Sequence, residues 1–191
     1  MHSAMYLVTG HPSIGKLALD PRHVVARGDA MVFEGPWPWA SPVVARLDDA
    51  AIAAARASGI DGYLVDALGE PGAGEAFVVA AHRMRDLVAF QPYAEQVGAI
   101  VEKFGGRFLA RSGKAEMLGG DFVSDRAVIL EFPRAADAVA FYISDIYAPL
   151  MKIRHAASDP RFLVMARAGA LPAAARTAAE SYLRAQAASS H

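Results

Sequence analysis

Hydrophobic and polar positions follow a regular pattern in the second half of the 191-residue chain. Apolar residues at three- and four-residue spacing predict an amphipathic helix over 86–104, which Gly105 and Gly106 end. Pro92 lacks an N–H and crowds the preceding turn, so this helix should begin near Gln91 or kink there. Short runs of β-compatible residues predict strands at 75–84, 107–111, 126–132 and 161–168, and two further helices fit 133–144 and 146–157. The order βαββαβ is that of a ferredoxin-like unit.

The first half of the chain repeats much of this order in a shortened form. The stretch ARGDAMVFEG begins at Ala26 and ARSGKAEMLGG begins at Ala110, so similar residues recur at matching places. The segments YLVTGH, VVARLDDAAIAAA and GYLVDA of the first half likewise match FVVAAH, VILEFPRAADAVA and RFLVMA of the second. The first half has no counterpart of the helices at 86–104 and 146–157. We therefore expect a tandem duplication whose N-terminal copy has lost helical cover.

The Gly-rich segment GEPGAG at 69–74 is the natural linker between the two copies. We expect a degenerate ferredoxin-like repeat without its first helix at 1–70 and a complete ferredoxin-like domain at 75–170. A C-terminal helix at 171–191 has Pro172 near its start and strong helix formers after it. The expected fold class is therefore α+β, with tandem ferredoxin-like units and a C-terminal helix.

Composition and charge narrow the possible classes of protein. The chain is 54% hydrophobic and 20% charged, which is typical of a globular protein with a sizeable core. A formal net charge of -1 with scattered cations argues against a nucleic-acid partner. There is no cysteine, no signal segment and no apolar run near the roughly 20 residues that cross a bilayer. We expect a cytoplasmic protein without a membrane partner, a disulfide or a thiolate metal site.

Residues 77–167 contain the segments GGRFLARSG, LGGDF, LEFP and FYISDIY. They resemble the bacterial family catalogued as domain of unknown function 1330. Phe141 stands where that family usually has Trp, while other family positions fit, namely Tyr142, Ser144, Tyr147 and Arg154. The resemblance implies a dimeric α/β barrel of two facing ferredoxin-like sheets, usually from two chains, and no established reaction. Because the first copy departs from the family, we expect this chain to close its barrel internally as a pseudo-dimer, and a further homodimer remains open.

Strand alternation sorts candidate polar residues onto the face that would line the barrel. It places Arg111 and Glu131 on one face, where they would form either a structural ion pair or part of a site. The matching positions of the first copy are Arg27 and Arg46, which leaves two cations without an anion. Such a surplus would bind a small anion such as a carboxylate or an enolate, unless Arg46 extends into solvent.

Histidines and tyrosines supply further candidates. His11 and His82 end equivalent first strands, and each is a possible general base or a histidine at the rim of the barrel. Tyr93 and Tyr142 lie on predicted helices, where they would offer hydroxyls to a pocket or pack in the core. No His pair or His–carboxylate cluster has metal-ligand spacing, so we expect neither a metal nor another cofactor.

Trp37 and Trp39 alternate with prolines in the segment GPWPWASP. Proline cannot continue a regular helix or a central strand, so this segment should be a stiff loop. It would cover either the mouth of the cavity or a dimer surface.

Two hypotheses of function follow from these residues. In the first, the barrel cavity belongs to a cofactor-independent enzyme that acts on an anionic or carbonyl substrate. Arg111 and Arg27 would orient the charge of the substrate, and His82 or Glu131 would move a proton. In the second, the protein is a non-catalytic ligand-binding or assembly protein. A cavity of roughly 300 Å³ or more between the sheets would favour the enzyme, and a filled interior would favour the second hypothesis.

Overall fold

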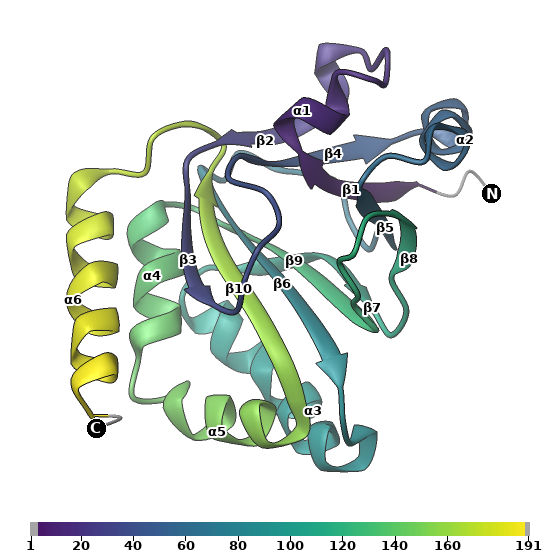
Figure 1. Cartoon of the computed structure of the whole chain (residues 1–191). Helices are drawn as coiled ribbons and strands as arrows, with labels where there is room; N and C mark the ends of the chain where they lie inside the picture. The colour runs from purple at the N-terminus through teal and green to yellow at the C-terminus, as the bar shows by residue number, and fades with distance from the viewer. Residues whose placement is uncertain (1–3, 190–191) are drawn as a thin grey trace.

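The structure is a computed structural model that describes residues 4–189, apart from the side chain of His11. The described residues form two β-sheets and six α-helices, which confirms a mixed α+β protein (Figure 1). Sheet A has the strand order β11-β2-β4-β1-β5-β8, with β1 (Met5–Gly10), β2 (Val24–Gly28), β4 (Pro42–Leu47), β5 (Gly62–Asp66), β8 (Glu116–Gly119) and β11 (Ala168–Gly169). Sheet B has the order β3-β10-β6-β9-β7, with β3 (Ala30–Glu34), β6 (Ala76–Met84), β7 (Arg107–Ser112), β9 (Arg126–Phe132) and β10 (Ser158–Ala166).

Helices cover the outer faces of the two sheets unequally. They are α1 (His11–Ile14), α2 (Asp49–Ser58), α3 (Leu87–Lys103), α4 (Ala135–Ile143), α5 (Ala148–Ala157) and α6 (Ala173–Ser189), with a 3-10 turn η1 (Pro21–His23). In Figure 1, α3, α4, α5 and α6 lie on the side of sheet B away from sheet A. Among the described helices, α2 and the four-residue α1 lie against sheet A. The first half therefore has less helical cover than the second, in agreement with its shortened sequence pattern.

Strands from each half of the chain join the sheet of the other half: besides the two-residue β11, which pairs parallel with β2, these are β3 and β8. β3 comes from the first half and pairs antiparallel with β10, where Met31 lies opposite Val164. β8 comes from the second half and pairs antiparallel with β5, where Glu116 lies opposite Leu64. These exchanged strands lie within the two near-repeated stretches of sequence, where the sequence pattern predicted no strand. Each of the two near-repeated stretches therefore contains a strand that pairs in the sheet of the other half.

Most element boundaries lie within a few residues of the predicted ones, and the start of α3 is an exception. β9 spans Arg126–Phe132, as its alternating pattern predicted. α3 begins at Leu87 and not near Gln91, because the side chain of Asp86 accepts hydrogen bonds from two backbone N–H groups of the first turn, at 2.9 Å each. Pro92 then removes one backbone donor from a helix that is already capped upstream.

The facing sides of the two sheets pack against each other as a hydrophobic core, which we call the inter-sheet core. Its buried members include Tyr6, Val8, Val44, Tyr63 and Val65 from sheet A and Phe77, Val79, Leu109, Ile129, Leu163 and Met165 from sheet B. A second core joins the outer face of sheet B to α3, α4, α5 and α6, and a third joins sheet A to α1 and α2. Apolar side chains therefore occupy the space where the sequence predicted a possible cavity.

Candidate functional site

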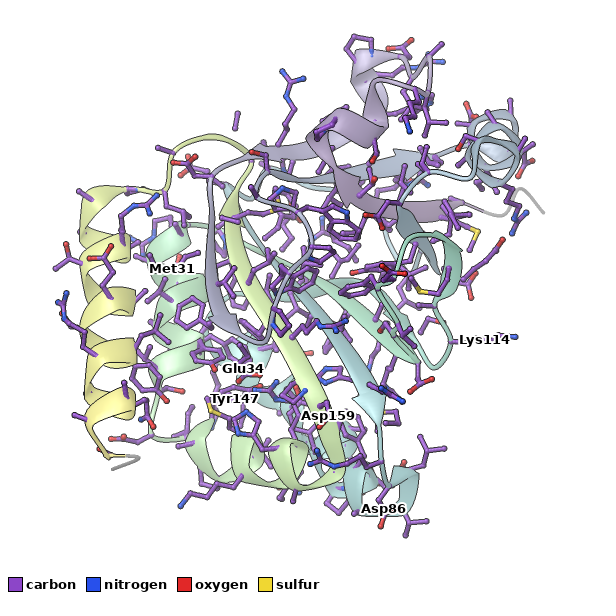
Figure 2. The ribbon with its side chains drawn as sticks, in the orientation of Figure 1. Met31, Glu34, Asp86, Lys114, Tyr147 and Asp159 are labelled. Atoms are coloured by element: carbon purple, nitrogen blue, oxygen red, sulfur yellow. The ribbon has the colours of Figure 1, made fainter. Side chains whose placement is uncertain are left out.

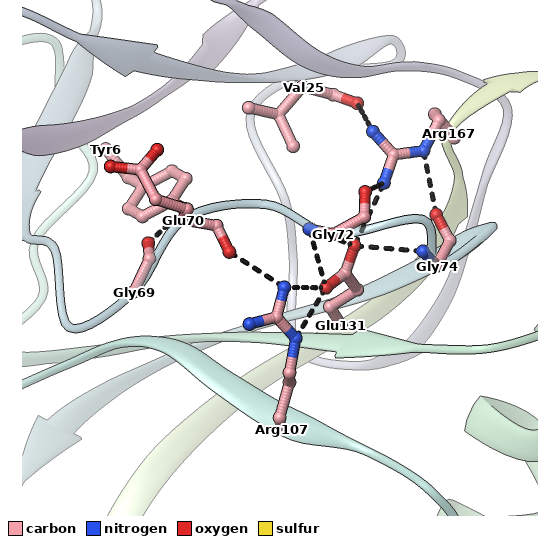
Figure 3. A network of polar contacts seen from close by, with 9 residues as sticks. All are labelled: Tyr6, Val25, Gly69, Glu70, Gly72, Gly74, Arg107, Glu131 and Arg167. Atoms are coloured by element: carbon pink, nitrogen blue, oxygen red, sulfur yellow. Dashed lines mark hydrogen bonds and ion pairs between the residues drawn. The ribbon is translucent and has the colours of Figure 1, made fainter.

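Glu131 is a buried carboxylate at the centre of a polar network beside the linker (Figure 3). Its oxygens accept hydrogen bonds from Nε of Arg107 at 2.8 Å and from Nη2 of Arg167 at 2.9 Å. The backbone N–H groups of Gly72 and Gly74 also donate to it, at 2.9 and 3.1 Å. Two cations and two backbone donors thus satisfy the carboxylate, and this geometry suits an anchor for the linker better than a proton acceptor.

The same network requires glycine in the linker. A Cβ on Gly72 would lie 2.7 Å from Nη2 of Arg107, and a Cβ on Gly74 would collide with the side chain of Glu131. The two arginines also bind linker carbonyls, since Arg107 donates to Glu70 and Arg167 donates to Gly72, each at 2.7 Å. The close approach of backbone to side chains therefore explains the Gly-rich composition of this segment.

The expectation that Arg111 shares a face with Glu131 is wrong. β7 and β9 pair with a register shift inside β7, as at a β-bulge. The shift turns the consecutive residues Leu109 and Ala110 toward the inter-sheet core and places Arg111 on the helix-covered face. Arg107 lies before the shift and opposite Glu131, so it takes the place that alternation assigned to Arg111.

The two arginines of the first half do not share a cavity with Arg111. Arg46 forms an ion pair with Glu70, so the linker supplies the carboxylate that the repeat lacks. Arg27 is exposed on β2 and lines an open surface groove together with Arg167. The expected surplus of positive charge between the sheets is therefore not formed by these residues.

A small enclosed pocket lies between α3 and the outer face of sheet B, and we call it the helix-side pocket. It is lined by Ala80, His82, Phe90, Tyr93, Ala94, Val97, Phe108, Arg111, Arg126, Val128, Leu130, Phe141 and Phe162. The cavity measures about 20 Å³, which is room for about one water molecule. Three predicted site residues, His82, Tyr93 and Arg111, therefore meet on the helix-covered face of sheet B.

His82 is a buried imidazole, 1% exposed, that lies on β6 at this pocket. Burial, followed by the positive charge of Arg154, lowers the pKa of His82 to about 3. The ring is therefore neutral near physiological pH and keeps one nitrogen as a hydrogen-bond acceptor. Its Nδ1 lies 3.4 Å from Oγ of Ser158, and its ring meets the edge of Phe90 at 5.5 Å between centroids.

The guanidinium groups of Arg111 and Arg126 lie at the same pocket. Arg111 donates to the backbone carbonyl of Ala94 in α3 and lies over the ring of Phe108 at 4.9 Å. Arg126 lies over the ring of Phe90 at 5.3 Å. Burial and then repulsion from Arg111 lower the pKa of Arg126. Since neither group forms an ion pair within residues 4–189, the pocket carries positive charge that no described carboxylate neutralises.

A second polar cluster joins the exchanged strand β3 to α5, and Figure 2 shows its Glu34 close to Tyr147. Arg154 is fully buried, and its Nη1 lies 2.6 Å from Glu34, which also accepts a hydrogen bond from Tyr142. Burial alone would raise the pKa of Glu34, but hydrogen bonds from His155, Arg154 and Tyr142 lower it to about 2. Tyr142 thus anchors β3 and does not line the helix-side pocket.

Trp37 and Trp39 close one end of the inter-sheet core. Both rings pack on Phe122, at 5.6 and 5.4 Å between centroids, and Phe122 stacks on Tyr63 at 5.5 Å. Nε1 of Trp39 donates to Asp61 at 3.0 Å. The loop is therefore part of a packed core and not a flap over an open mouth, while a role at a dimer surface stays a prediction.

Other expectations concern His11, metals and membranes. His11 begins α1, but its side chain lies outside the described part of the chain. Within residues 4–189, no three His, Cys, Asp or Glu side chains are grouped so that they could hold a metal ion. None of the described helices is both long enough and apolar enough to cross a membrane.

Sequence reasoning missed three polar residues around this site. Arg126 begins β9 directly opposite His82, so the register of these neighbouring strands would have identified it. Ser158 comes just before the predicted last strand, and no sequence signal marks it. Glu34 lies on an exchanged strand, and its contact with Arg154 spans 120 residues of sequence. Local patterns cannot reveal such a contact.

Comparisons with known proteins identify the second half of the chain. Residues 75–168 match the family model described as a domain of unknown function (DUF1330), so the chain carries this domain and the expected resemblance is confirmed. A solved structure of a protein of unknown function from Rhodopseudomonas palustris is similar, with 22% sequence identity and a TM-score of 0.43. It matches over 61% of this chain and 91% of that chain. No curated protein matches the sequence.

Proposed function

We propose that the protein binds a compact organic anion in the helix-side pocket and acts on it without a cofactor. In this proposal Arg111 and Arg126 hold the anionic group, and the aromatic and aliphatic walls hold the rest of the molecule. His82 is the proton acceptor, and the negative charge of the bound anion would raise its pKa from about 3 because it favours the imidazolium. The reaction class is a proton transfer: a C–H or O–H bond of the substrate breaks, an N–H bond forms on His82, and the electron pair stays on the substrate beside the two guanidinium groups.

The unpaired charge of Arg111 and Arg126 is the observation that carries this proposal. Several other buried or half-buried arginines meet carboxylates, as Arg107 meets Glu131 and Arg154 meets Glu34, whereas Arg161 meets the carbonyl of Val123 and the ring of Phe122. The two guanidinium groups at the pocket instead meet a carbonyl and two aromatic rings. A bound carboxylate would give both of them a charge-assisted partner, which is roughly twice as strong as a neutral hydrogen bond.

The size of the pocket sets a condition on this proposal. At about 20 Å³ the cavity is far smaller than the roughly 300–1,000 Å³ of typical ligand pockets, so a ligand requires α3 to move outward. An anion would favour that movement, because it competes with the carbonyl of Ala94 in α3 for the guanidinium group of Arg111. The proposal therefore predicts a rearranged α3 in the bound protein.

We also propose that the two halves are copies of one ferredoxin-like unit that close on each other as a barrel-like pseudo-dimer. Their strand orders support this. Sheet A contains β5-β1-β4-β2 and sheet B contains β10-β6-β9-β7, so in both halves the fourth, first, third and second main strands are neighbours. The exchange of β3 and β8 also supports this relation, because each half gives one of these strands to the sheet of the other half. On this interpretation the units divide at the linker, near 70–75.

The alternative function is a non-catalytic binding or assembly protein. The packed inter-sheet core favours it, because a filled interior was the outcome that distinguished it from an enzyme with a barrel cavity. Under this alternative the helix-side pocket holds only water, and the chain acts through contacts with a second copy.

A thermal-shift screen with small carboxylates tests the proposed function. The wild type should be stabilised in a concentration-dependent way, because a ligand that binds only the folded state stabilises by RT ln(1 + [L]/Kd). Arg111→Ala and Arg126→Ala should lose this response, while Arg134→Ala, a surface arginine paired with Asp137, should keep it. Equal stabilisation of all four proteins would exclude the helix-side pocket as the site.

The proton transfer has its own test. A carboxylate that stabilises the protein is incubated with it in D₂O, and NMR follows the incorporation of deuterium at carbon. Exchange by the wild type and none by His82→Gln is the expected result. A bound carboxylate that never exchanges at carbon would rule out proton transfer from a C–H bond.

A further inference from the structure

The hydroxyl of Ser158 lies near the carbonyl of Arg154 and the ring of His82, and it can donate only one hydrogen bond. Oγ of Ser158 donates to the backbone carbonyl of Arg154 at 2.9 Å, and it also lies 3.4 Å from Nδ1 of His82. A carbonyl oxygen can only accept, so the serine proton belongs to that bond. Oγ can then only accept from His82, so this contact favours the ring proton on Nδ1.

This tautomer leaves Nε2 of His82 as a lone-pair acceptor. No described residue donates a hydrogen bond to Nε2, although the ring is buried and lines the helix-side pocket. The low pKa of His82 agrees with a single ring proton near neutral pH. The residues that line the pocket thus include His82 with its acceptor Nε2, the cationic donors Arg111 and Arg126, and Tyr93, whose hydroxyl is hydrogen-bonded with that of Tyr147.

We propose that the ligand of the helix-side pocket is a hydroxycarboxylate, whose carboxylate meets Arg111 and Arg126 and whose hydroxyl donates to Nε2 of His82. Ser158 is the positioning residue: it sets the tautomer of His82. The pocket therefore prefers a ligand that can donate a hydrogen bond to Nε2 of His82. The proposal rests on the proposed function for the place of binding. It adds the chemical class of the ligand and the residue that determines it.

The reason for selectivity is the cost of an unpartnered acceptor. A carboxylate without a hydroxyl would exclude water from Nε2 and give that nitrogen no donor. A methyl ether in place of the hydroxyl would fail in the same way, because its oxygen has no proton. Sites that bind a substrate hydroxyl through buried polar groups reject analogues without it for this reason.

Matched ligands test the class. Lactate, propionate and 2-methoxypropionate form one series, and mandelate, phenylacetate and O-methylmandelate form a second with a larger apolar part. In the wild type, each hydroxy acid should bind about tenfold more tightly than its two analogues, as one hydrogen bond of about 1 kcal/mol or slightly more implies. Titration calorimetry measures the ratio.

Variants of Ser158 test its role. In Ser158→Ala the preference for the hydroxyl should fall below about threefold while the anion still binds, because the imidazole is free to place its proton on Nε2. Ser158→Thr keeps the hydroxyl and should restore the preference. The tautomer of His82 is read directly by ¹⁵N NMR: Nδ1–H is expected in the wild type without ligand and in Ser158→Thr.

The outcomes separate this inference from the proposed function. If no carboxylate binds to the wild type, the proposed function fails and the ligand class with it, whatever the tautomer. If carboxylates bind through Arg111 and Arg126 without preference for a hydroxyl, the proposed function survives and the ligand class is refuted. An Nε2–H tautomer in the wild type refutes the positioning role of Ser158 even if Ser158→Ala fails to fold.

Discussion

Two groups of arginines lie on opposite faces of sheet B and differ in what surrounds their charge. On the face toward sheet A, Arg107 and Arg167 share the carboxylate of Glu131 with two backbone N–H groups. On the helix-covered face, Arg111 and Arg126 meet aromatic rings and a carbonyl, and they repel each other. The residue types are the same, but only the first group is neutralised within the protein.

This contrast is the physical reason for assigning the first group a structural role and for proposing a binding role for the second. A satisfied network stabilises the fold, and removing a member leaves its partners unpaired. Arg111 and Arg126 gain a carbonyl hydrogen bond and cation–π contacts, but no described carboxylate pairs with their charge. Measuring how much each charged group contributes to the free energy of unfolding tests this difference.

The largest effect is expected at Glu34, the anionic partner of the fully buried Arg154. Glu34→Gln should lower the free energy of unfolding by about 3–5 kcal/mol, because it leaves a buried guanidinium without a counter-charge. Denaturant unfolding measures this. The matched control is the double variant Glu34→Gln, Arg154→Met, which should recover part of the loss. A small loss in the single variant would mean that water reaches Arg154.

Glu131→Gln should cost less, about 2–3 kcal/mol, because Arg107 and Arg167 are partly exposed and can turn to water. The variant should also release the linker, so limited proteolysis should cut within 69–74 sooner than in the wild type. If stability and cleavage were both unchanged, the network would not be the anchor of the linker.

The pKa of His82 predicts a loss of stability in mildly acidic solution. Its folded pKa of about 3 lies below the unfolded value of 6.5, so the unfolded state binds the proton first as the pH falls. Between pH 6.5 and 4.5 the wild type should lose about 2 kcal/mol from this group. Glu34, with its pKa lowered to about 2, contributes fully above its unfolded value of 4.5 and loses its contribution only below it.

The control for this pH dependence is His82→Gln, which should have a flatter profile of unfolding free energy between pH 6.5 and 4.5. Chemical denaturation at several pH values measures both profiles. Equal slopes in the two proteins would show that another group titrates in this window.

The smallest effect is expected at Arg126. Arg126→Met should change the stability of the ligand-free protein by less than about 1 kcal/mol, in either direction, because the variant removes a repulsion with Arg111 and no ion pair. Thermal unfolding without ligand measures it beside Glu131→Gln. A loss as large as that of Glu131→Gln would place Arg126 among the structural charges.

The sequence predicted those parts of the fold that depend on local pattern. The alternation of β9 and the apolar spacing of α3 both reflect one face packed in a core, and both elements lie where they were expected apart from the start of α3. The exchanged strands β3 and β8 were missed, because they have five and four residues and pair with distant strands. Nothing within so short a segment specifies a partner in the other half of the chain.

The candidate site was predicted in its residues more than in its geometry. His82, Tyr93 and Arg111 do meet, but a single register shift in β7 turned Arg111 to the helix-covered face, while Arg107, which lies before the shift, stayed opposite Glu131. Because side chains alternate with a period of two, one extra residue reverses every assignment beyond it. The sequence could not indicate Ser158 either, because its proposed role depends on a contact between strands β6 and β10.

The exchanged strand β3 has a consequence for how the chain is made. Its partner β10 ends at Ala166, so β3 leaves the ribosome more than a hundred residues before the strand that it joins. Until then its apolar residues Met31 and Phe33 have no sheet to lie on. β3 can therefore pair only late in synthesis, and a chain that stalls before residue 158 would expose an unpaired apolar strand to chaperones or to other nascent chains.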